Sequence, residues 1–426
     1  MAHVLVPTTG NPILEDGLLN DGHTVTLIVP ANAVPTYRQR YPELSVFGVH
    51  SWDDLAELTA LNYHLPEVDA VATNDEQCVV AAAHLRELRG LPGLSVADAR
   101  CFTDKHLMLT RLAQAGIPVA PHRVVHHESE IAAAAEAIGW PVVVKPRSGM
   151  ATVHTYRVGN PQELAQLRAT GVFETPVEDT AHRFGASDLL GALNGARGGY
   201  LVQACIDVVE ECFVDLYLFE GERLLAAPGR YHKPIMLSMG GGHRHWTVLS
   251  PDLPETIAVV DLVHRAVTAL GSHTGVHHVE VLRDRSGKLW LGEAAARTGG
   301  GIYQAYGLQY AMDVPHVLAQ LALGVRPDID QLTPHYPALT TLALAPAPGI
   351  VRHFTSADDL RALPAVVDVD LTLTIGQPVP RGFGSMPGGG RILIRPRATD
   401  PGTVLADVEE LLAVLALDIA LALAKV

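Results

Sequence analysis

GVHHVEVL (residues 275–282) and KLWLGEAAARTGGG (residues 288–301) are two apolar segments that each carry one acidic residue. Between them lies DRSG (residues 284–287), a turn-forming sequence, so the whole stretch predicts a β-hairpin. Centring that hairpin on the last two residues of the turn places Glu280 opposite Glu293. The sequence therefore predicts two carboxylates on one face of a sheet.

Two like charges in this position need a counter-charge. Cross-strand partners lie about 5 Å apart, so the carboxylates of Glu280 and Glu293 repel each other. A divalent cation would reverse the sign of that interaction, and Mg2+ prefers carboxylate oxygens together with substrate phosphates. Arg297 is placed to meet charge on a transferred phosphoryl group. The same register pairs Leu282 with Leu291. The alternative is an exposed acidic hairpin followed by an unrelated arginine.

Length and charge set limits on the class of protein. A chain of 426 residues is too long for one ordinary core, so we expect two or three domains. With 48% hydrophobic and 18% charged residues, the composition is that of a globular protein. The formal net charge of -15 argues against nucleic acid as the main partner, because phosphate backbones require clusters of lysine and arginine.

Cysteine spacing and the chain ends indicate the compartment. The four cysteines show no CxxC spacing and are expected to be reduced thiols in a cytoplasmic protein. The first residues lack the basic and long apolar regions of a signal peptide. The apolar run 404–426 contains four acidic residues, which exclude a membrane span and favour an amphipathic helix.

Strands and helices alternate in the first hundred residues, which predicts a parallel sheet covered on both faces. Expected strands are 3–7, 24–29 and 68–73, the last followed by a helix that runs to Leu88. Ligands gather at the carboxyl ends of such strands. The polar residues expected there are Thr8, Thr9, Asn74 and Glu76. Loop chemistry and helix capping are the simpler explanation for each of them alone.

Two lysines are candidates for binding phosphate. Lys105 lies in the first turn of a helix expected over 104–115, where the helix dipole disfavours a cation unless an anion is bound. Lys145 ends the buried strand 142–146 and needs an anionic partner there. The small polar loop that follows, RSGMAT (147–152), includes Ser148 and offers backbone N–H groups to phosphate oxygens. A solvated Lys105 and a structural Lys145 are the alternatives.

Further elements complete the expected order. The expected strands are 200–206 and 212–219; Glu211 leads into the second, which forms a hairpin with the segment that contains Leu224 and Leu225. Helices are expected over 254–270 and 313–323. A domain boundary is expected at 346–349, followed by a C-terminal lobe that ends in the long helix.

This order of features resembles the ATP-grasp superfamily. The similarity runs from about Cys101 to Gly301, and within the superfamily the chain looks most like the carboxylate–amine ligases that include bacterial L-amino-acid (dipeptide) ligases. The resemblance implies an α/β ATP-grasp fold. It divides the chain into an N-terminal parallel-sheet α/β domain (1–100), an ATP-grasp core (101–345) with a mobile lid at about 121–206, and a C-terminal α+β lobe (346–426).

The resemblance also implies roles for individual residues. It assigns the nucleotide phosphates to Lys105, Lys145 and Ser148, adenine to the backbone of Gln203, Ala204, Cys205 and Ile206, ribose to Glu211, Mg2+ or Mn2+ to Glu280 and Glu293, and the acyl phosphate to Arg297. Glu76, His232, Gly300 and Gly301 are assigned to the substrate, and His278 is taken as catalytic, either binding a substrate carboxylate or acting as a general base. One departure is Ala295, where many members of the family carry an asparagine, which puts a second metal ion in doubt.

The activity implied is formation of an amide or peptide bond through an acyl phosphate, with release of ADP and phosphate, on amino acids or other small acids. We expect small-molecule substrates, no membrane partner, and a homodimer as one option. Three alternatives remain: a carboxylase subunit on the same scaffold, a phosphotransferase with similar phosphate clamps, and a non-catalytic nucleotide-binding module. The presence of Lys145, Glu280, Glu293 and Arg297 together argues against the last.

Overall fold

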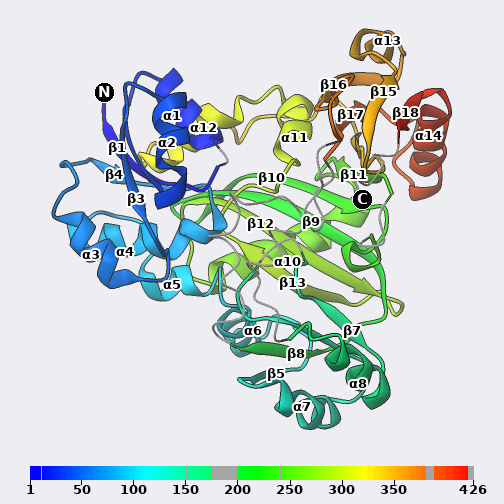
Figure 1. Ribbon diagram of the computed structural model, residues 1–426, viewed down its shortest axis with the longest axis horizontal. Helices are drawn as coiled ribbons and strands as arrows, with labels where there is room; N and C mark the ends of the chain where they lie inside the picture. Colours follow the sequence, from blue (N-terminus) through cyan, green and yellow to red (C-terminus); the bar gives the residue numbers. More distant parts are fainter. Residues whose placement is uncertain (11, 150–151, 174–198, 239–241, 380–387, 421–426) are drawn as a thin grey trace, which may run out of the picture.

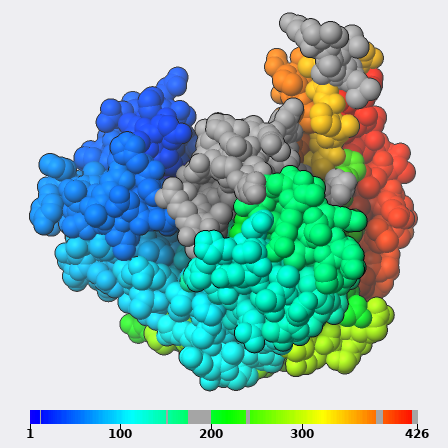
Figure 2. Space-filling view, turned by 60° about the horizontal axis from the view of Figure 1, so that its bottom comes forward, coloured from blue at the N-terminus to red at the C-terminus, as the bar shows by residue number. Residues whose placement is uncertain are grey.

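The protein folds into an N-terminal lobe, a central sheet with a projecting lid, and a C-terminal region (Figure 1). The computed structural model describes residues 1–10, 12–149, 152–173, 199–238, 242–379 and 388–420. The lid lies between the N-terminal lobe and the C-terminal region when the molecule is viewed from below (Figure 2). Within the described residues, no helix is long and apolar enough to cross a membrane.

A four-stranded parallel sheet forms the N-terminal lobe, as the alternating pattern predicted. Its order is β3 (Ser45–Val49), β2 (Thr24–Pro30), β1 (His3–Pro7) and β4 (Ala70–Val71). The helices of this lobe are α1 (Ile13–Asn20), α2 (Val34–Arg40), α3 (Leu55–Asn62), α4 (Val79–Arg89) and α5 (Val96–Arg100). Alternate residues of β1 face opposite sides: Val4 and Val6 pack towards α1 and the central core, and Leu5 packs towards α3 and α4.

The central sheet has eight antiparallel strands and continues into the C-terminal region. Its order is β13 (Leu289–Ala295), β12 (Gly275–Asp284), β9 (Val208–Phe219), β10 (Glu222–Tyr231), β11 (Arg244–Leu249), β14 (Ala338–Ala343), β17 (Gly390–Ile394) and β16 (Val366–Leu371). Helices α6 (Lys105–Gln114) and α10 (Pro254–Ala269) cover one face. Helices α11 (Tyr303–Tyr310) and α12 (Val314–Ala322) cover the other and connect it to the N-terminal lobe.

The lid has a hydrophobic core of its own. Its antiparallel sheet has the order β5 (His122–Val125), β8 (Tyr200–Ala204), β6 (Val142–Pro146) and β7 (Tyr156–Val158), with helices α7 (Ile131–Ile138) and α8 (Pro161–Ala169) packed on it. This cluster is separate from the central core, and movement of the lid as one unit stays a prediction. Residues 150–151 and 174–198 of the expected lid lie outside the described part of the chain.

The C-terminal region adds strands to the central sheet and a small layer outside it. The pairing of β14 with β17 carries the sheet across the boundary expected at 346–349. Outside it lie β15 (Ile350–Phe354), β18 (Leu417–Ala420), α13 (Ala357–Arg361) and α14 (Pro401–Val414). The helix expected over 404–426 is wrong for residues 415–420, because the helix ends at Val414 and residues 417–420 pair with β15 instead, while residues 421–426 lie outside the described part of the chain. That pairing satisfies backbone groups along β15 that a helix would leave exposed.

Other expectations about elements need smaller corrections. The strand expected over 68–73 is only two residues long, because the chain turns after Val71 and Thr73 Oγ1 donates to the carbonyl of Pro7 at 2.8 Å. The strand β3 was missed. The strand expected over 200–206 ends at Ala204, and β10 runs well beyond Leu225. The four cysteines are free thiols, as expected.

Gly17 is the tightest contact between the N-terminal lobe and α12. A Cβ on Gly17 would lie 2.1 Å from the carbonyl oxygen of Pro315, which is backbone and has little freedom to yield. We expect Gly17→Ala to destabilise the protein by about 1–3 kcal/mol, measured as the denaturant midpoint. Gly402→Ala, also in a helix but with its nearest atom 3.4 Å from the added Cβ, is the control and should be neutral to slightly stabilising, because alanine favours a helix more than glycine does. Equal midpoints for both variants would contradict this reading of the interface.

Candidate active site

The hairpin formed by β12 and β13 brings the two glutamates together. Glu280 pairs with Glu293 across the strands, which confirms the expected register at this point. A bulge between Glu280 and Val281 then shifts the pairing, so Leu291 lies opposite Val281 and not Leu282. The predicted leucine pair is therefore wrong. A bulge adds one residue to one strand, which a count from the turn cannot detect.

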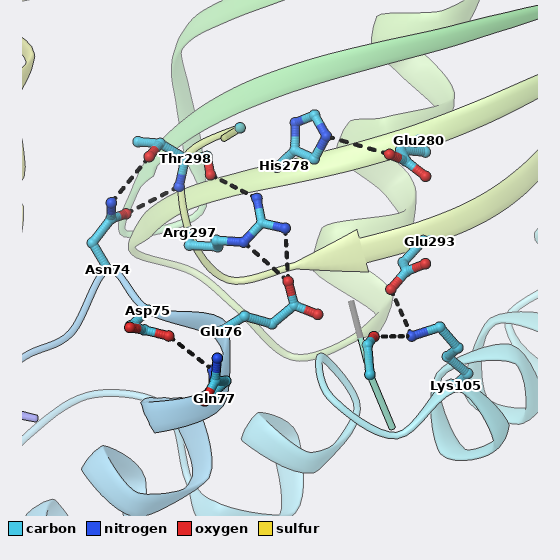
Figure 3. Close-up of polar contacts among 12 residues, drawn as sticks. Asn74, Asp75, Glu76, Gln77, Lys105, His278, Glu280, Glu293, Arg297 and Thr298 are labelled. Atoms are coloured by element: carbon cyan, nitrogen blue, oxygen red, sulfur yellow. Dashed lines mark hydrogen bonds and ion pairs between the residues drawn. The ribbon is translucent and has the colours of Figure 1, made fainter. Parts of the chain in front are cut away.

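Lys105 supplies the counter-charge to Glu293. Its Nζ lies 2.7 Å from Glu293 Oε1 and donates to the carbonyl of Gly149 at 2.6 Å (Figure 3). Burial alone would lower the pKa of Lys105, but Glu293 and Glu76 outweigh it and raise the pKa. Burial likewise raises the pKa of Glu293, and Lys105 and Lys145 reverse that shift. The sequence predicted that Lys105, at the start of α6, needs an anion beside it. In the structure the carboxylate of Glu293 is that anion.

Lys145 approaches the same carboxylates from the lid. It lies on β6. Burial lowers the pKa of Lys145, and the negative charges of Glu293, Glu280 and Glu211 offset that effect only in part, so the pKa stays below its ordinary value. The adjoining loop is fixed to α6, since the backbone N–H of Lys105 donates to the carbonyl of Arg147 at 2.8 Å. Ser148, in that loop, is exposed.

Glu280 has two neighbours on the central sheet. The hydroxyl of Tyr231, the last residue of β10, donates to Glu280 Oε1 at 3.4 Å. His278 Nε2 lies 3.7 Å from the same oxygen (Figure 3). Burial lowers the pKa of His278, but Asp215 and Glu280 outweigh it and raise the pKa to about 9. A cationic imidazole is a poor general base at neutral pH, so the placement favours an electrostatic role.

Glu211 lies inside β9, where the sequence placed it just before a strand. It accepts a hydrogen bond from the backbone N–H of Ile235 at 2.8 Å and is 6% exposed. Burial, with the nearby charges of Glu280 and Glu293, raises its pKa to about 8. This carboxyl is therefore protonated at neutral pH when no cation or ligand is bound.

The segment expected to bind adenine includes the last two residues of β8 and the two residues after it. Gln203 is buried, and it pairs with His122 and Val143 in the lid sheet. The backbone N–H groups of Ala204 and Cys205 donate to the carbonyls of Pro121 and Pro141 at 2.8 and 3.1 Å. These two backbone N–H groups are therefore already hydrogen-bonded within the protein. Ile206 lies beyond the strand, and its carbonyl accepts from the N–H of Val208 at 2.9 Å.

Arg297 connects the hairpin to the N-terminal lobe (Figure 3). Its Nε and Nη2 donate to Glu76 Oε2 at 3.0 and 2.7 Å, and its Nη1 donates to the carbonyl of Thr298 at 2.7 Å. Next to it, Asn74 exchanges two hydrogen bonds of 3.0 Å with Thr298. Polar residues after β4 therefore do converge on the arginine that the sequence singled out.

Gly300, Gly301 and His232 are three of the residues that the sequence analysis assigned to the substrate. Where a Cβ would stand on Gly300, no atom lies within 4 Å, and Gly301 has a φ of +71°. His232 follows Tyr231, and its ring stacks on that of His245 with centroids 4.2 Å apart. The assignment of His232 to the substrate stays a prediction.

The donor set suits a hard cation that also takes phosphate oxygens. In the described part of the chain, no group of three or more His, Cys, Asp or Glu side chains is arranged to hold a metal ion by itself. Glu280 and Glu293 offer two carboxylates, and their side chains are 23% and 27% exposed. Mg2+ is bound in this way, through one or two carboxylates plus substrate phosphates.

Sequence reasoning missed residues that support the site. Asp215 is fully buried, accepts from His278 Nδ1 at 2.7 Å, and accepts from the backbone N–H of Gly299 at 2.8 Å. It is the last residue of the segment ECFVD that begins at Glu211, so its position four residues after that glutamate is the signal in the sequence that could have identified it. The contacts of Tyr231 and Thr298 have no comparable signal in the sequence.

Comparisons with known proteins agree with this geometry. The chain is 24% identical over 372 residues to the L-arginine-specific L-amino acid ligase of Bacillus subtilis, covering 86% of this chain and 84% of the relative. An L-amino acid ligase structure from Bacillus licheniformis superposes with a TM-score of 0.72 at 18% identity, covering 99% of both chains. No family model matches.

A more distant structure shares the fold with nucleotide present. The biotin carboxylase domain dimer of the Hydrogenobacter thermophilus 2-oxoglutarate carboxylase, in complex with MgADP, ADP and bicarbonate, superposes with a TM-score of 0.66 at 15% identity, covering 98% of this chain and 91% of that one. The chain has the ATP-grasp fold of these structures. The likeness to the Bacillus subtilis ligase, together with the order of the site residues, supports a carboxylate–amine ligase, an enzyme that forms carbon–nitrogen bonds.

The raised pKa of Glu211 predicts a pH-dependent stability of the ligand-free protein. Since its folded pKa of about 8 lies above the ordinary value of 4.5, its contribution to stability is greatest below pH 4.5 and is lost as pH rises towards 8. Glu211→Gln removes this loss of stability with rising pH, because glutamine does not ionise, and its side-chain oxygen can still accept the hydrogen bond from the N–H of Ile235. We expect the variant to gain on the order of 2 kcal/mol over the parent between pH 5 and pH 8, measured by denaturant unfolding without metal or nucleotide. Exposed Glu43→Gln should show no such trend, and a gain for Glu211→Gln that is flat with pH would contradict the assignment.

Proposed function

We propose that the protein uses ATP and Mg2+ to join a small carboxylic acid to an amine through an acyl phosphate, and that the acid is an amino acid. The observation that carries the proposal is the placement of Glu280 and Glu293 opposite each other between Lys105, Lys145 and Arg297. Cations of the chain and a metal carboxylate pair in one place are what phosphoryl transfer requires.

Residue roles follow from charge and position. Glu280 and Glu293 would hold Mg2+, or Mn2+ in its place, and the ion would supply neutralisation of phosphate charge. Lys105 and Lys145 would bind the nucleotide phosphates, and Glu211 the ribose. In the ligand-free arrangement Lys105 is paired with Glu293 at 2.7 Å, so binding exchanges that ion pair for contacts of both side chains with the ligands.

The chemistry balances without a protein nucleophile. The substrate carboxylate oxygen attacks the γ-phosphorus of ATP, and the bond to the β-phosphate oxygen breaks, which gives an acyl phosphate and ADP. The amine then attacks the acyl carbon, phosphate leaves, and the amine gives up a proton. Arg297 is placed to stabilise charge on the transferred group, while a closed lid would keep water from the acyl phosphate.

Substrate identity is supported by the named relatives. One of them is specific for L-arginine and another is an L-amino acid ligase, which favours amino acids as the acid here. The dimer described for the biotin carboxylase domain supports a homodimer for this chain as well. Those sequence likenesses favour the ligase over the carboxylase and the phosphotransferase, and product analysis separates the three.

The products of ATP turnover test the function. We expect ADP and phosphate to form in the presence of Mg2+ when an amino acid and an amine are supplied together, with an amide of matching mass. The measurement is phosphate release for amino acids in pairs, followed by mass spectrometry. Omitting the amine, or adding bicarbonate in place of the acid, provides the control. AMP and pyrophosphate as products would show that an adenylate is formed instead.

Arg297 and Lys145 should differ in what they contribute. Because Arg297 would act on the group in transfer, Arg297→Ala should lower kcat by about 100-fold or more and leave ATP affinity within a few-fold. Lys145→Ala should weaken ATP binding itself, as a ground-state phosphate contact. Arg297→Lys should rescue poorly, because the planar fork is lost. Calorimetry beside single-turnover rates decides between them, and a large loss of ATP affinity with unchanged chemistry in Arg297→Ala would contradict its role.

A further inference from the structure

Asp215 is a fully buried carboxylate in the middle of β9, and the chemistry proposed above does not use it directly. Its relative exposure is 0%. A buried carboxylate is costly unless both oxygens are hydrogen-bonded, and here both are. Oδ1 accepts from His278 Nδ1 at 2.7 Å, and Oδ2 accepts from the backbone N–H of Gly299 at 2.8 Å. The two partners come from different parts of the site.

Through His278, Asp215 reaches a metal carboxylate. Because a carboxylate can only accept, Nδ1 of His278 carries the proton, which fixes the orientation of the ring. The opposite nitrogen, Nε2, then lies 3.7 Å from Glu280 Oε1 (Figure 3). The His278 side chain is 7% exposed and stands between the Asp215 and Glu280 carboxylates, so a displacement of Asp215 would be passed on to Glu280.

Through Gly299, Asp215 reaches the loop that faces the substrate. A Cβ on Gly299 would lie 2.8 Å from His278 Nδ1 and 3.0 Å from Asp215 Oδ1. The loop backbone therefore rests directly on the Asp215–His278 pair, and only glycine permits that approach. Gly300 and Gly301 follow immediately, and Arg297 lies two residues earlier.

We propose that Asp215 is a positioning residue that sets the metal carboxylate Glu280 and the Gly299–Gly301 loop relative to each other, so that cation and substrate are held in register for phosphoryl transfer. The inference rests on the proposed function for the identity of the ligands. The geometry of the Asp215 contacts does not depend on it. Groups that orient metal ligands in this way usually change metal affinity or activity by about 10–100-fold when they are altered.

Asp215→Asn is the direct test, because asparagine keeps the shape but offers one acceptor for two donors. We expect kcat to fall about 100-fold and the affinity for Mn2+, titrated by electron paramagnetic resonance with ADP present, to fall about 10-fold. Affinity for ADP without metal should stay within about twofold. Thr340→Val is the matched control: it removes a buried hydrogen bond of 2.9 Å to Thr247 in the same sheet, and it should leave kcat and Mn2+ affinity unchanged.

A second variant, in the glycine loop, tests the contacts among Asp215, His278 and Gly299. Gly299→Ala forces a methyl group against His278 and Asp215 while both remain present, so it should show the same losses. If the three residues act as one unit, Asp215→Asn and Gly299→Ala combined should be no worse than the more damaging single variant. Should Asp215→Asn not fold, Gly299→Ala carries the test alone.

The outcomes separate this proposal from the function it rests on. Formation of an amide by the parent enzyme tests the function, and all variants are compared with that parent. If the parent forms no amide, the Mn2+ titration still decides on Asp215. Unchanged Mn2+ affinity in Asp215→Asn and Gly299→Ala, or losses that multiply in the double variant, would overturn the positioning role.

Discussion

Everything in this site follows from placing two carboxylates opposite each other in a partly buried hairpin. Glu280 and Glu293 face each other across the hairpin, where like charges repel unless cations lie close by. The chain supplies those cations from separate elements: Lys105 from the start of α6, Lys145 from the lid, and His278 from β12 itself. Lys145 on the lid and the carboxylates on the central sheet attract each other across the contact between the two parts. The same surplus of carboxylates makes the place suitable for a divalent cation.

A second set of contacts ties the N-terminal lobe to that hairpin. Arg297 and Glu76 form a buried ion pair, and Asn74 and Thr298 exchange two hydrogen bonds beside it. Removing one partner of such a pair leaves an uncompensated buried charge, which typically costs about 3–5 kcal/mol. The N-terminal sheet therefore does more than add a lobe. It delivers the residues after β4 to the arginine and fixes the backbone from which the glycine loop departs.

The lid has a hydrophobic core of its own and contacts the rest of the protein beside α6. Its hydrophobic core is separate from the cores on the two faces of the central sheet. It is held near α6 by the carbonyls of Gly149 and Arg147 and by the ion pair of Arg147 with Asp104. Those contacts lie beside Lys105, so the group proposed to bind phosphate is also the group that anchors the lid loop.

The sequence determined the local features of this protein, and the tertiary structure decided how they meet. Alternation of strands and helices predicted the parallel N-terminal sheet, and the turn at 284–287 predicted the hairpin, because both depend on neighbours in the chain. The hairpin begins with Arg283 opposite Leu289, and a bulge after Glu280 shifts the register so that Glu280 lies opposite Glu293; a count from the turn assumes an unbroken register and cannot show this. The strand at 417–420 could not be predicted, since it depends on a distant partner strand. The same holds for Asp215, whose partners lie 63 and 84 residues away. A buried aspartate in an apolar strand reveals its role only when the fold shows which donors reach it.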